Sequence, residues 1–210
     1  MTPPVRAAVF ASGSGTNLQA LLDHETADGR YHIVVVVSDR EGAGALGRAE
    51  AAGRLAQVIE VGGRPSERIA TETLALLESL DVQAIFLAGY LRLIPAAVVS
   101  AYPRRILNIH PALLPAFGGK GMYGEPVHEA VLASDAELSG ATVHYVDEEY
   151  DKGANVGQWR VQVLPGDDVG TLAARVLSVE HRLYPAVVDH VCEAWAEGRD
   201  PGPFTLSQPE

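Results

Sequence analysis

The stretch that decides the fold spans residues 6–38 and reads RAAVFASGSGTNLQALLDHETADGRYHIVVVVS. Residues 6–12 predict a strand, and after a glycine-rich turn a helix is expected from Thr16 to about Asp23. Residues 31–38 are almost continuously apolar, which is typical of a strand covered on both faces, as in a parallel sheet. This stretch therefore predicts one β-α-β unit.

The same alternation continues outward from this unit. The pattern predicts helices and strands in turn, with helices at residues 44–52 and 65–80 and strands at 56–60, 84–88 and 106–110. We therefore predict an α/β fold built on an open, doubly wound, mostly parallel sheet with right-handed crossovers. Sheets of this kind bind ligands beyond the carboxyl ends of their strands.

The second half of the chain has a different pattern. It predicts a loop rich in Gly and Pro, a short helix and two strands added to the sheet in antiparallel orientation, at residues 111–126, 127–134, 141–146 and 158–163. A long helix is expected from about Asp168, and Pro185 should kink or break it. We expect one domain over residues 1–197 and a loosely attached tail over 198–210.

Charge and cysteine content exclude several classes of protein. The 210 residues carry 16 Lys and Arg against 27 Asp and Glu, a formal net charge of −11, which is unfavourable for binding nucleic acid or an anionic membrane. The single cysteine, Cys192, cannot form an internal disulfide and indicates a reducing compartment; a half-buried helix position is expected for it. No apolar run is long enough to span a membrane and no signal-peptide core is present, so a cytoplasmic protein is expected.

The first candidate site is the glycine-rich segment SGSGTN at residues 12–17, between the first strand and the first helix. Glycines allow a ligand to approach the backbone, and the helix N-terminus offers free N–H groups, so this segment predicts a phosphate cradle without a basic residue. The alternative interpretation is a tight turn in which Ser14 or Thr16 caps the helix.

The second candidate is Asn108 and His110, at the end of a predicted buried strand. Residues two apart share one face of a strand, so both side chains should point the same way. An amide donor beside an imidazole suits stabilisation of an oxyanion or proton transfer. The alternative is a satisfied polar pair in the core, but each group would cost about 1–3 kcal/mol if left unpaired, which favours function.

Acidic residues form two further candidates. Four carboxylates lie within five residues at 147–151, and one of them could orient His110 and raise its pKa; the pattern does not choose which. Glu180 falls beside the apolar stripe of the last helix, where it could pair with an amine, although spacing alone favours a helix-edge charge. No histidine shows convincing metal spacing, so no metal is predicted; ordinary structural positions are expected for His24, His32, His128, His144 and His190.

Five segments together resemble the phosphoribosylglycinamide formyltransferase family of de novo purine synthesis, within the formyltransferase superfamily. They read VFASGSGTNLQALL, FLAGYLRLIP, ILNIHPALLPAFGG, GATVHYVDEEYDKG and RVLSVEHRLYP. The resemblance implies a Rossmann-like formyltransferase fold, a nucleotide-binding half at about residues 1–105 and a folate and catalytic half at about 106–197. It also implies 10-formyltetrahydrofolate as co-substrate, glycinamide ribonucleotide as the amine substrate, and no metal.

The resemblance further implies roles for individual residues. The catalytic residues would be Asn108, His110 and Asp151, which selects Asp151 among the four acids. The glycinamide ribonucleotide would contact Gly15, Thr16, Asn17, Leu177, Ser178, Val179 and Glu180. The folate would contact Arg68, Leu91, Arg92, Leu93, Ile94 and Asn108. Asn108 and protonated His110 would stabilise the oxyanion, and Asp151 would keep His110 charged and oriented.

This chain departs from the family pattern at a few positions. The loop GGKGMYGEPVHEAV is longer than in the shortest members and carries Glu125, a carboxylate that would alter lid packing or the local field. Ala112 replaces a usual Ser, and Ala154, Asn155 and Val156 replace a usual Pro-Ile-Ile. These differences leave the chemistry intact and affect fine positioning of the substrates.

Three alternatives are considered. A formyltetrahydrofolate hydrolase would share the catalytic residues but carry an N-terminal regulatory domain, for which the early first strand leaves no room. A methionyl-tRNA formyltransferase would need a further C-terminal domain and a basic surface. A non-catalytic nucleotide-binding module of the same fold would not need Asn108, His110 and Asp151 together. The oligomeric state, monomer or homodimer, stays open.

Overall fold

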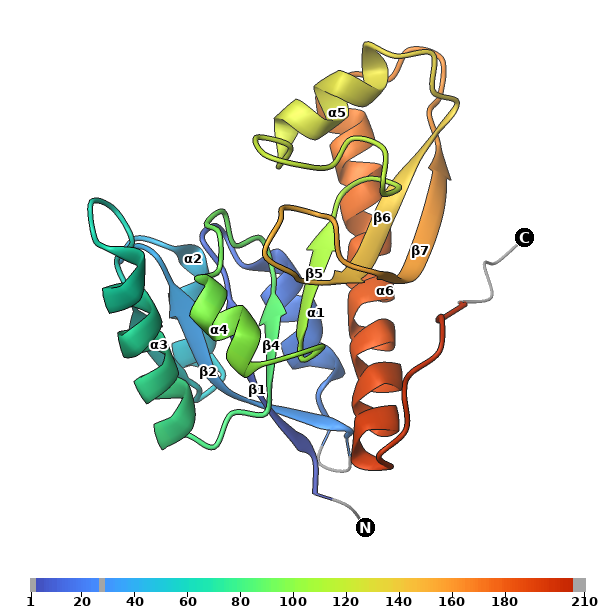
Figure 1. The fold of residues 1–210 in the computed structure, drawn as a ribbon. Coiled ribbons are helices and arrows are strands. Elements are labelled where there is room, and N and C mark those ends of the chain that lie inside the picture. The colour runs from blue at the N-terminus through green and yellow to red at the C-terminus, as the bar shows by residue number, and fades with distance from the viewer. Residues whose placement is uncertain (1–2, 27–28, 206–210) are drawn as a thin grey trace.

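The computed structural model describes residues 3–26 and 29–205, which build one seven-stranded sheet with helices on both faces (Figure 1). The strands lie in the order β3-β2-β1-β4-β5-β6-β7. Their bounds are β1 Val5–Phe10, β2 Tyr31–Ser38, β3 Leu55–Val58, β4 Ala84–Leu87, β5 Ile106–His110, β6 Leu138–Tyr145 and β7 Asn155–Gln162. The first five strands are parallel, and β6 pairs antiparallel with β5 on one side and with β7 on the other. The predicted mostly parallel α/β sheet with antiparallel additions is thus confirmed.

In the described part of the chain, six helices accompany the sheet: α1 Thr16–His24, α2 Gly44–Ala51, α3 Ser66–Ser79, α4 Ala96–Ala101, α5 Glu125–Leu132 and α6 Val169–Ala196. The side chains of β1 alternate between the two faces of the sheet and show which helices cover each face. Ala7 and Val9 belong to the core under α1, α2 and α6, whereas Ala8 and Phe10 belong to the core under α3 and α4. Both faces of the central strands are therefore buried, which explains why β2 is almost continuously apolar.

The short helix α4 is not predicted from the sequence, because its six residues are too few to show a periodic pattern. Helix α5 begins at Glu125, two residues earlier than expected, with Pro126 in its first turn, where a missing N–H is tolerated. Strands β6 and β7 extend further than expected because their antiparallel pairing continues from Leu138 and Gln162 to His144 and Asn155.

The long helix α6 starts as predicted and does not break at Pro185. Asp168 caps it, accepting a hydrogen bond from the Thr171 N–H at 2.7 Å. A proline inside a helix costs about 3 kcal/mol. Several fully buried side chains around it, Leu183, Tyr184, Val187 and Val188, each contribute about 1.5–3 kcal/mol and outweigh that cost. Cys192 lies further along the same face and is fully buried, not half-buried as expected.

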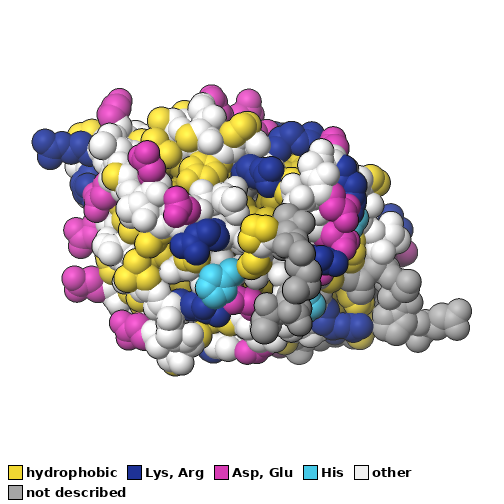
Figure 2. Space-filling model, turned by 90° about the horizontal axis from the view of Figure 1, so that it is seen from below, with side chains coloured by type: hydrophobic (Ala, Val, Ile, Leu, Met, Phe, Trp, Pro, Cys, Tyr) yellow, Lys and Arg dark blue, Asp and Glu magenta, His cyan; other side chains and the backbone are white. Residues whose placement is uncertain are grey.

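The tail beyond α6 runs back along the sheet. The Phe204 N–H donates to the Val156 carbonyl at 2.7 Å, so the tail pairs with the edge strand β7. The rest of the expected tail, 206–210, and residues 1–2 lie outside the described residues. Figure 2 shows the molecule from below, with positive and negative side chains interspersed. Within the described residues, no helix combines the length and apolarity needed to span a membrane.

Candidate active site

A cavity of about 870 Å³ opens at the carboxyl ends of β4 and β5, between the glycine-rich loop, α5 and α6. This is the edge at which the sheet topology predicts ligand binding. Many of the residues proposed from the sequence line it together, namely Asn17, Leu91, Arg92, Leu93, Asn108, His110, Asp151, Leu177 and Glu180. Residues far apart in the chain therefore share one cavity.

Other proposed residues do not line this cavity. Of the four residues proposed on α6, Leu177 and Glu180 line the cavity, because residues three apart share a helix face, whereas Ser178 and Val179 do not line it. Ile94 is buried in the core on the α3 side of the sheet, and Gly15 is buried behind the loop. Thr16 lines a separate groove between α1 and α6, and Arg68 lines a shallow groove on α3.

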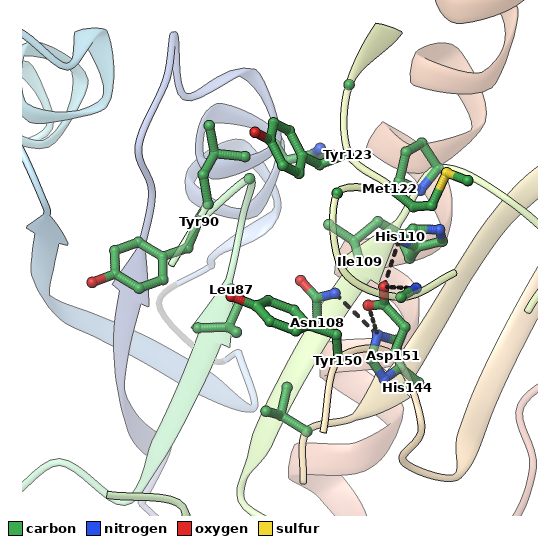
Figure 3. A pocket seen from close by; sticks show the side chains of 18 of the residues that line it. Leu87, Tyr90, Asn108, Ile109, His110, Met122, Tyr123, His144, Tyr150 and Asp151 are labelled. Atoms are coloured by element: carbon green, nitrogen blue, oxygen red, sulfur yellow. Dashed lines mark hydrogen bonds and ion pairs between the residues drawn. The ribbon is translucent and has the colours of Figure 1, made fainter. Parts of the chain in front are cut away.

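Two side chains at the end of β5, Asn108 and His110, form the centre of the site (Figure 3). His110 is buried, and its Nε2 lies 2.9 Å from the carbonyl oxygen of Phe117. A carbonyl oxygen only accepts hydrogen bonds, so Nε2 carries the proton and Nδ1 faces the Asp151 carboxylate. The loop after β5 is held in place by Thr142, which accepts from the Leu114 N–H at 3.0 Å.

Asp151 connects three parts of the site from the loop after β6. Its carboxylate accepts the Gly119 N–H at 2.9 Å and lies 3.4 Å from His144 Nε2 and 3.7 Å from His110 Nδ1. Burial raises the pKa of Asp151, but the hydrogen bonds from His144 and Gly119 outweigh it and hold the pKa below its usual range. Asp151 is therefore a carboxylate at neutral pH.

The expected protonation of His110 needs correction. Burial lowers the pKa of the His110 imidazole, and the Asp151 charge and the hydrogen bond to Phe117 oppose this only in part. The net pKa lies below the ordinary value of 6.5. Asp151 does raise the pKa, as predicted, but the loss of hydration is the larger effect. The lowered pKa therefore favours the neutral form of the His110 imidazole at pH 7.

Two histidines that the sequence analysis assigns to ordinary positions belong to this site. His144 lies opposite Asn108 in the β5–β6 register, and its Nε2 is 3.0 Å from the Asn108 Nδ2. His128 is the fourth residue of α5 and is buried, with Nδ1 lacking a hydrogen-bond partner among the described residues. Both line the cavity. The strand pairing that places His144 could not be inferred from spacing within one segment.

Glu180, on α6, forms a contact with α1 at one end of the cavity. It is 7% exposed, and the Asn17 Nδ2 donates to its carboxylate at 2.6 Å. Burial raises the pKa of Glu180, and the hydrogen bond from Asn17 opposes this. The helix-edge interpretation favoured by spacing is therefore wrong. The alternative cap interpretation of the loop is also wrong, because the residue preceding α1 is Gly15, with φ 75°, and no side chain caps the helix.

The opposite wall presents apolar surface. Leu91, Leu93, Tyr123 and Tyr150 are large and exposed at the cavity mouth, at 38%, 45%, 51% and 38%, respectively. Two hydrogen bonds hold the segment that contains Leu91 and Arg92 in place. The Arg92 Nε donates to buried Asp39 at 2.8 Å, and the Leu91 N–H donates to the Ser12 hydroxyl at 3.0 Å. A flat aromatic ligand fits such a wall, since aromatic and aliphatic side chains can cover its ring without removing polar groups of the protein from water.

No group of three or more His, Cys, Asp and Glu side chains is arranged to hold a metal ion in the part of the chain that the structure describes. Glu125, the departure noted in the sequence, lines the cavity from the first turn of α5. Cationic side chains among the lining residues are few, Arg92 and Lys120. An anionic ligand at the α1 end of the cavity would therefore rely on backbone N–H groups.

Comparison with known proteins shows the family to which the chain belongs. Residues 5–188 match the family described as formyl transferase, so the chain belongs to this class of protein. The chain is 44% identical to the chloroplastic phosphoribosylglycinamide formyltransferase of Arabidopsis thaliana, over 93% of this chain and 68% of that protein. It is 36% identical to the Bacillus subtilis phosphoribosylglycinamide formyltransferase, over 86% and 91%, respectively. The chain belongs to the phosphoribosylglycinamide formyltransferase family.

Solved structures agree with this assignment. Glycinamide ribonucleotide transformylase 1 from Geobacillus kaustophilus superposes with a TM-score of 0.83 at 39% identity, covering 90% of this chain and 100% of that one. A formyltetrahydrofolate deformylase from Pseudomonas syringae has a TM-score of 0.82 but 23% identity, and this chain covers 62% of it. The second likeness shows a shared fold alone.

Proposed function

We propose that the protein transfers the formyl group of 10-formyltetrahydrofolate to the amine of glycinamide ribonucleotide. The products are formylglycinamide ribonucleotide and tetrahydrofolate, in de novo purine synthesis. One observation carries the proposal: Ser14, Asn17 and Glu180 line the same cavity as His110. A transferase needs a site for a phosphorylated amine beside its catalytic residues, whereas a hydrolase needs only water there.

The acceptor would bind at the α1 end of the cavity. The free N–H groups at the start of α1 suit a phosphate, and the helix dipole favours a negative charge there. The buried Glu180 carboxylate, held by Asn17, suits the amine end of the same molecule. Binding energy from the phosphate would position the amine for attack.

The donor would bind along the opposite wall, with its flat ring against the segment that contains Leu91, Arg92 and Leu93. Its formyl group would then lie over Asn108 and His110. This arrangement assigns acceptor binding mainly to the N-terminal half of the chain and catalysis to β5, β6 and the loops that follow them.

The reaction would proceed through a tetrahedral intermediate. The amine nitrogen attacks the formyl carbon, a C–N bond forms, and the carbonyl electron pair moves to the oxygen. The Asn108 amide would donate to this oxyanion, and one such donor typically contributes about 2.7–4 kcal/mol. Neutral His110 would accept the amine proton at Nδ1, with the charge stabilised by Asp151. The oxyanion electron pair would then re-form the C=O bond, the bond between the formyl carbon and the folate nitrogen would break, and His110 would return the proton to that nitrogen.

The lowered pKa of His110 supports this order of events, because a base must be neutral to accept a proton. Once the His110 imidazolium forms, the Asp151 carboxylate would stabilise it, since that carboxylate lies 3.7 Å from His110 Nδ1. Stabilisation of the oxyanion by protonated His110 would thus follow the proton transfer rather than precede it.

Turnover assays test the function directly. Purified protein is mixed with 10-formyltetrahydrofolate, with and without glycinamide ribonucleotide, and formate and tetrahydrofolate are measured. We expect tetrahydrofolate release only with the amine present, and little formate. Rapid formate release without the amine would show the hydrolase activity instead.

We also propose that the protein acts in the cytoplasm on small molecules, without a nucleic acid or membrane partner. The net charge of −11 and the single cysteine support this. Size-exclusion chromatography with light scattering would separate the monomer from the homodimer.

A further inference from the structure

Helix α2 holds the glycine-rich loop from the side opposite to the cavity. The Arg48 Nε donates to the Ser14 carbonyl oxygen at 2.8 Å, and its guanidinium also donates to the Gln19 side chain at 3.1 Å. Nearby, the Ala45 N–H donates to the Gly13 carbonyl oxygen at 3.2 Å. Two successive carbonyl groups of the loop are therefore anchored on α2.

Anchoring a carbonyl also orients the N–H group of the same peptide. A peptide unit is planar and trans, so its C=O and N–H point in opposite directions. With the Gly13 and Ser14 carbonyls turned toward α2, the N–H groups of Ser14 and Gly15 point away from it. Among the described residues, none accepts a hydrogen bond from these two N–H groups. They are thus available to a ligand on the side where Ser14 and Asn17 line the cavity.

The loop has little freedom to adopt another conformation. Gly15 has a left-handed backbone, and a Cβ there would lie 2.7 Å from the Ala45 Cα. A Cβ on Gly44 would lie 3.1 Å from the Ser14 carbonyl oxygen. The backbones of loop and helix are therefore in direct contact, and Arg48 adds the side-chain anchor at one end of this contact.

We propose that Arg48 is a positioning residue for the phosphate of the acceptor substrate. By holding the Ser14 carbonyl, it would aim the Gly15 N–H at the phosphate and complete a cradle with the first N–H groups of α1. Arg48 lines the separate groove with Thr16 and His181, not the cavity, so it acts through the loop. The inference rests on the proposed function, which supplies the phosphorylated substrate.

Steady-state kinetics of Arg48→Gln tests this role. The KM for glycinamide ribonucleotide should rise about ten- to a hundredfold, the effect of losing a charge-assisted hydrogen bond. The KM for the formyl folate and the kcat should stay within about twofold. Arg48→Lys should recover part of the affinity, because an ammonium group can donate to one carbonyl. Arg30→Gln, which removes an exposed ion pair with Glu193, is the matched control and should leave all three constants unchanged.

A second measurement does not depend on turnover. Inorganic phosphate is titrated into 15N-labelled protein, and the amide signals of Ser14 and Gly15 are followed. These signals should shift at the same phosphate concentration in the wild type and in Arg30→Gln. In Arg48→Gln the half-maximal shift should need about tenfold more phosphate. Unchanged KM and unchanged titration in folded Arg48→Gln would overturn the inference. A wild type that binds phosphate at these amides but transfers no formyl group would overturn the proposed function and leave the role of Arg48 standing.

Discussion

The two ends of the cavity are built in different ways. The proposed acceptor end is the loop at residues 12–17, where backbone groups of neighbouring residues would bind the phosphate. The proposed catalytic end brings together Asn108, His144 and Asp151 from two strands and a loop, and their side chains would do the chemistry. In this proposal, recognition of the acceptor would depend on local backbone geometry, whereas catalysis would depend on buried titratable groups from distant segments. Substitutions at the two ends should therefore change different kinetic constants.

The largest effect is expected from Asp151→Asn. The kcat should fall about 10²- to 10⁴-fold, the usual range for a lost acid–base partner, while both KM values change little. Removing the negative charge should also lower the pKa of His110 further below its ordinary value. Single-turnover kinetics and an NMR titration of the His110 ring measure the two effects. An unchanged His110 pKa in the variant would disprove the pairing.

Gly15→Val tests the other end. Its left-handed φ of 75° and the contact with Ala45 leave no room for a side chain, so the loop must shift. The KM for glycinamide ribonucleotide should rise about tenfold or more while the KM for the formyl folate is unchanged. Initial-rate measurements with each substrate varied in turn decide this. Equal changes for both substrates would contradict a separate backbone-based acceptor end.

His144→Phe sharpens the description of the catalytic end. An aromatic ring is kept, but Asn108 loses its hydrogen-bond partner and the Asp151 carboxylate loses the imidazole nitrogen 3.4 Å away. We expect the kcat to fall about 10- to 100-fold, less than for Asp151→Asn, with little change in either KM. Rescue of activity in His144→Gln, whose amide can still hydrogen-bond to Asn108, would show that orientation is the function of His144. Wild-type activity in folded His144→Phe would rule out this role.

The smallest effect is expected from His128→Gln, in stability rather than rate. Burial lowers the pKa of His128 below 6.5, with a smaller contribution from His110. The unfolded chain therefore binds a proton before the folded protein does, so stability falls as pH decreases below about 6.5. His128→Gln should reduce this loss of stability, so the drop in Tm between pH 7.5 and pH 5.5 should be about 2–4 °C smaller than in the wild type. Thermal melts of both proteins at pH 5.5 and 7.5 measure it; identical pH dependence would contradict a buried neutral His128.

The sequence analysis and the structure agree most where one segment contains the whole feature. Asn108 and His110 were expected on one face of a strand because they are two residues apart, and both line the cavity. Glu180 shows the limit of such reasoning. Its position beside the apolar stripe indicated a helix-edge charge, yet it is buried against Asn17, 163 residues away in the chain. Pro185 shows the same limit, since packing on both sides of it keeps α6 continuous.

By itself the sequence determined the alternation of strands and helices, the glycine-rich loop and the shared face of Asn108 and His110, because these follow from periodicity and backbone chemistry over a few residues. Only the tertiary structure decided that His144 and His128 join the site, that Arg48 anchors the loop, and that burial lowers the pKa of His110. These properties depend on strand register and on exclusion of water. Both arise from contacts between segments whose separation along the chain says nothing about their distance in space.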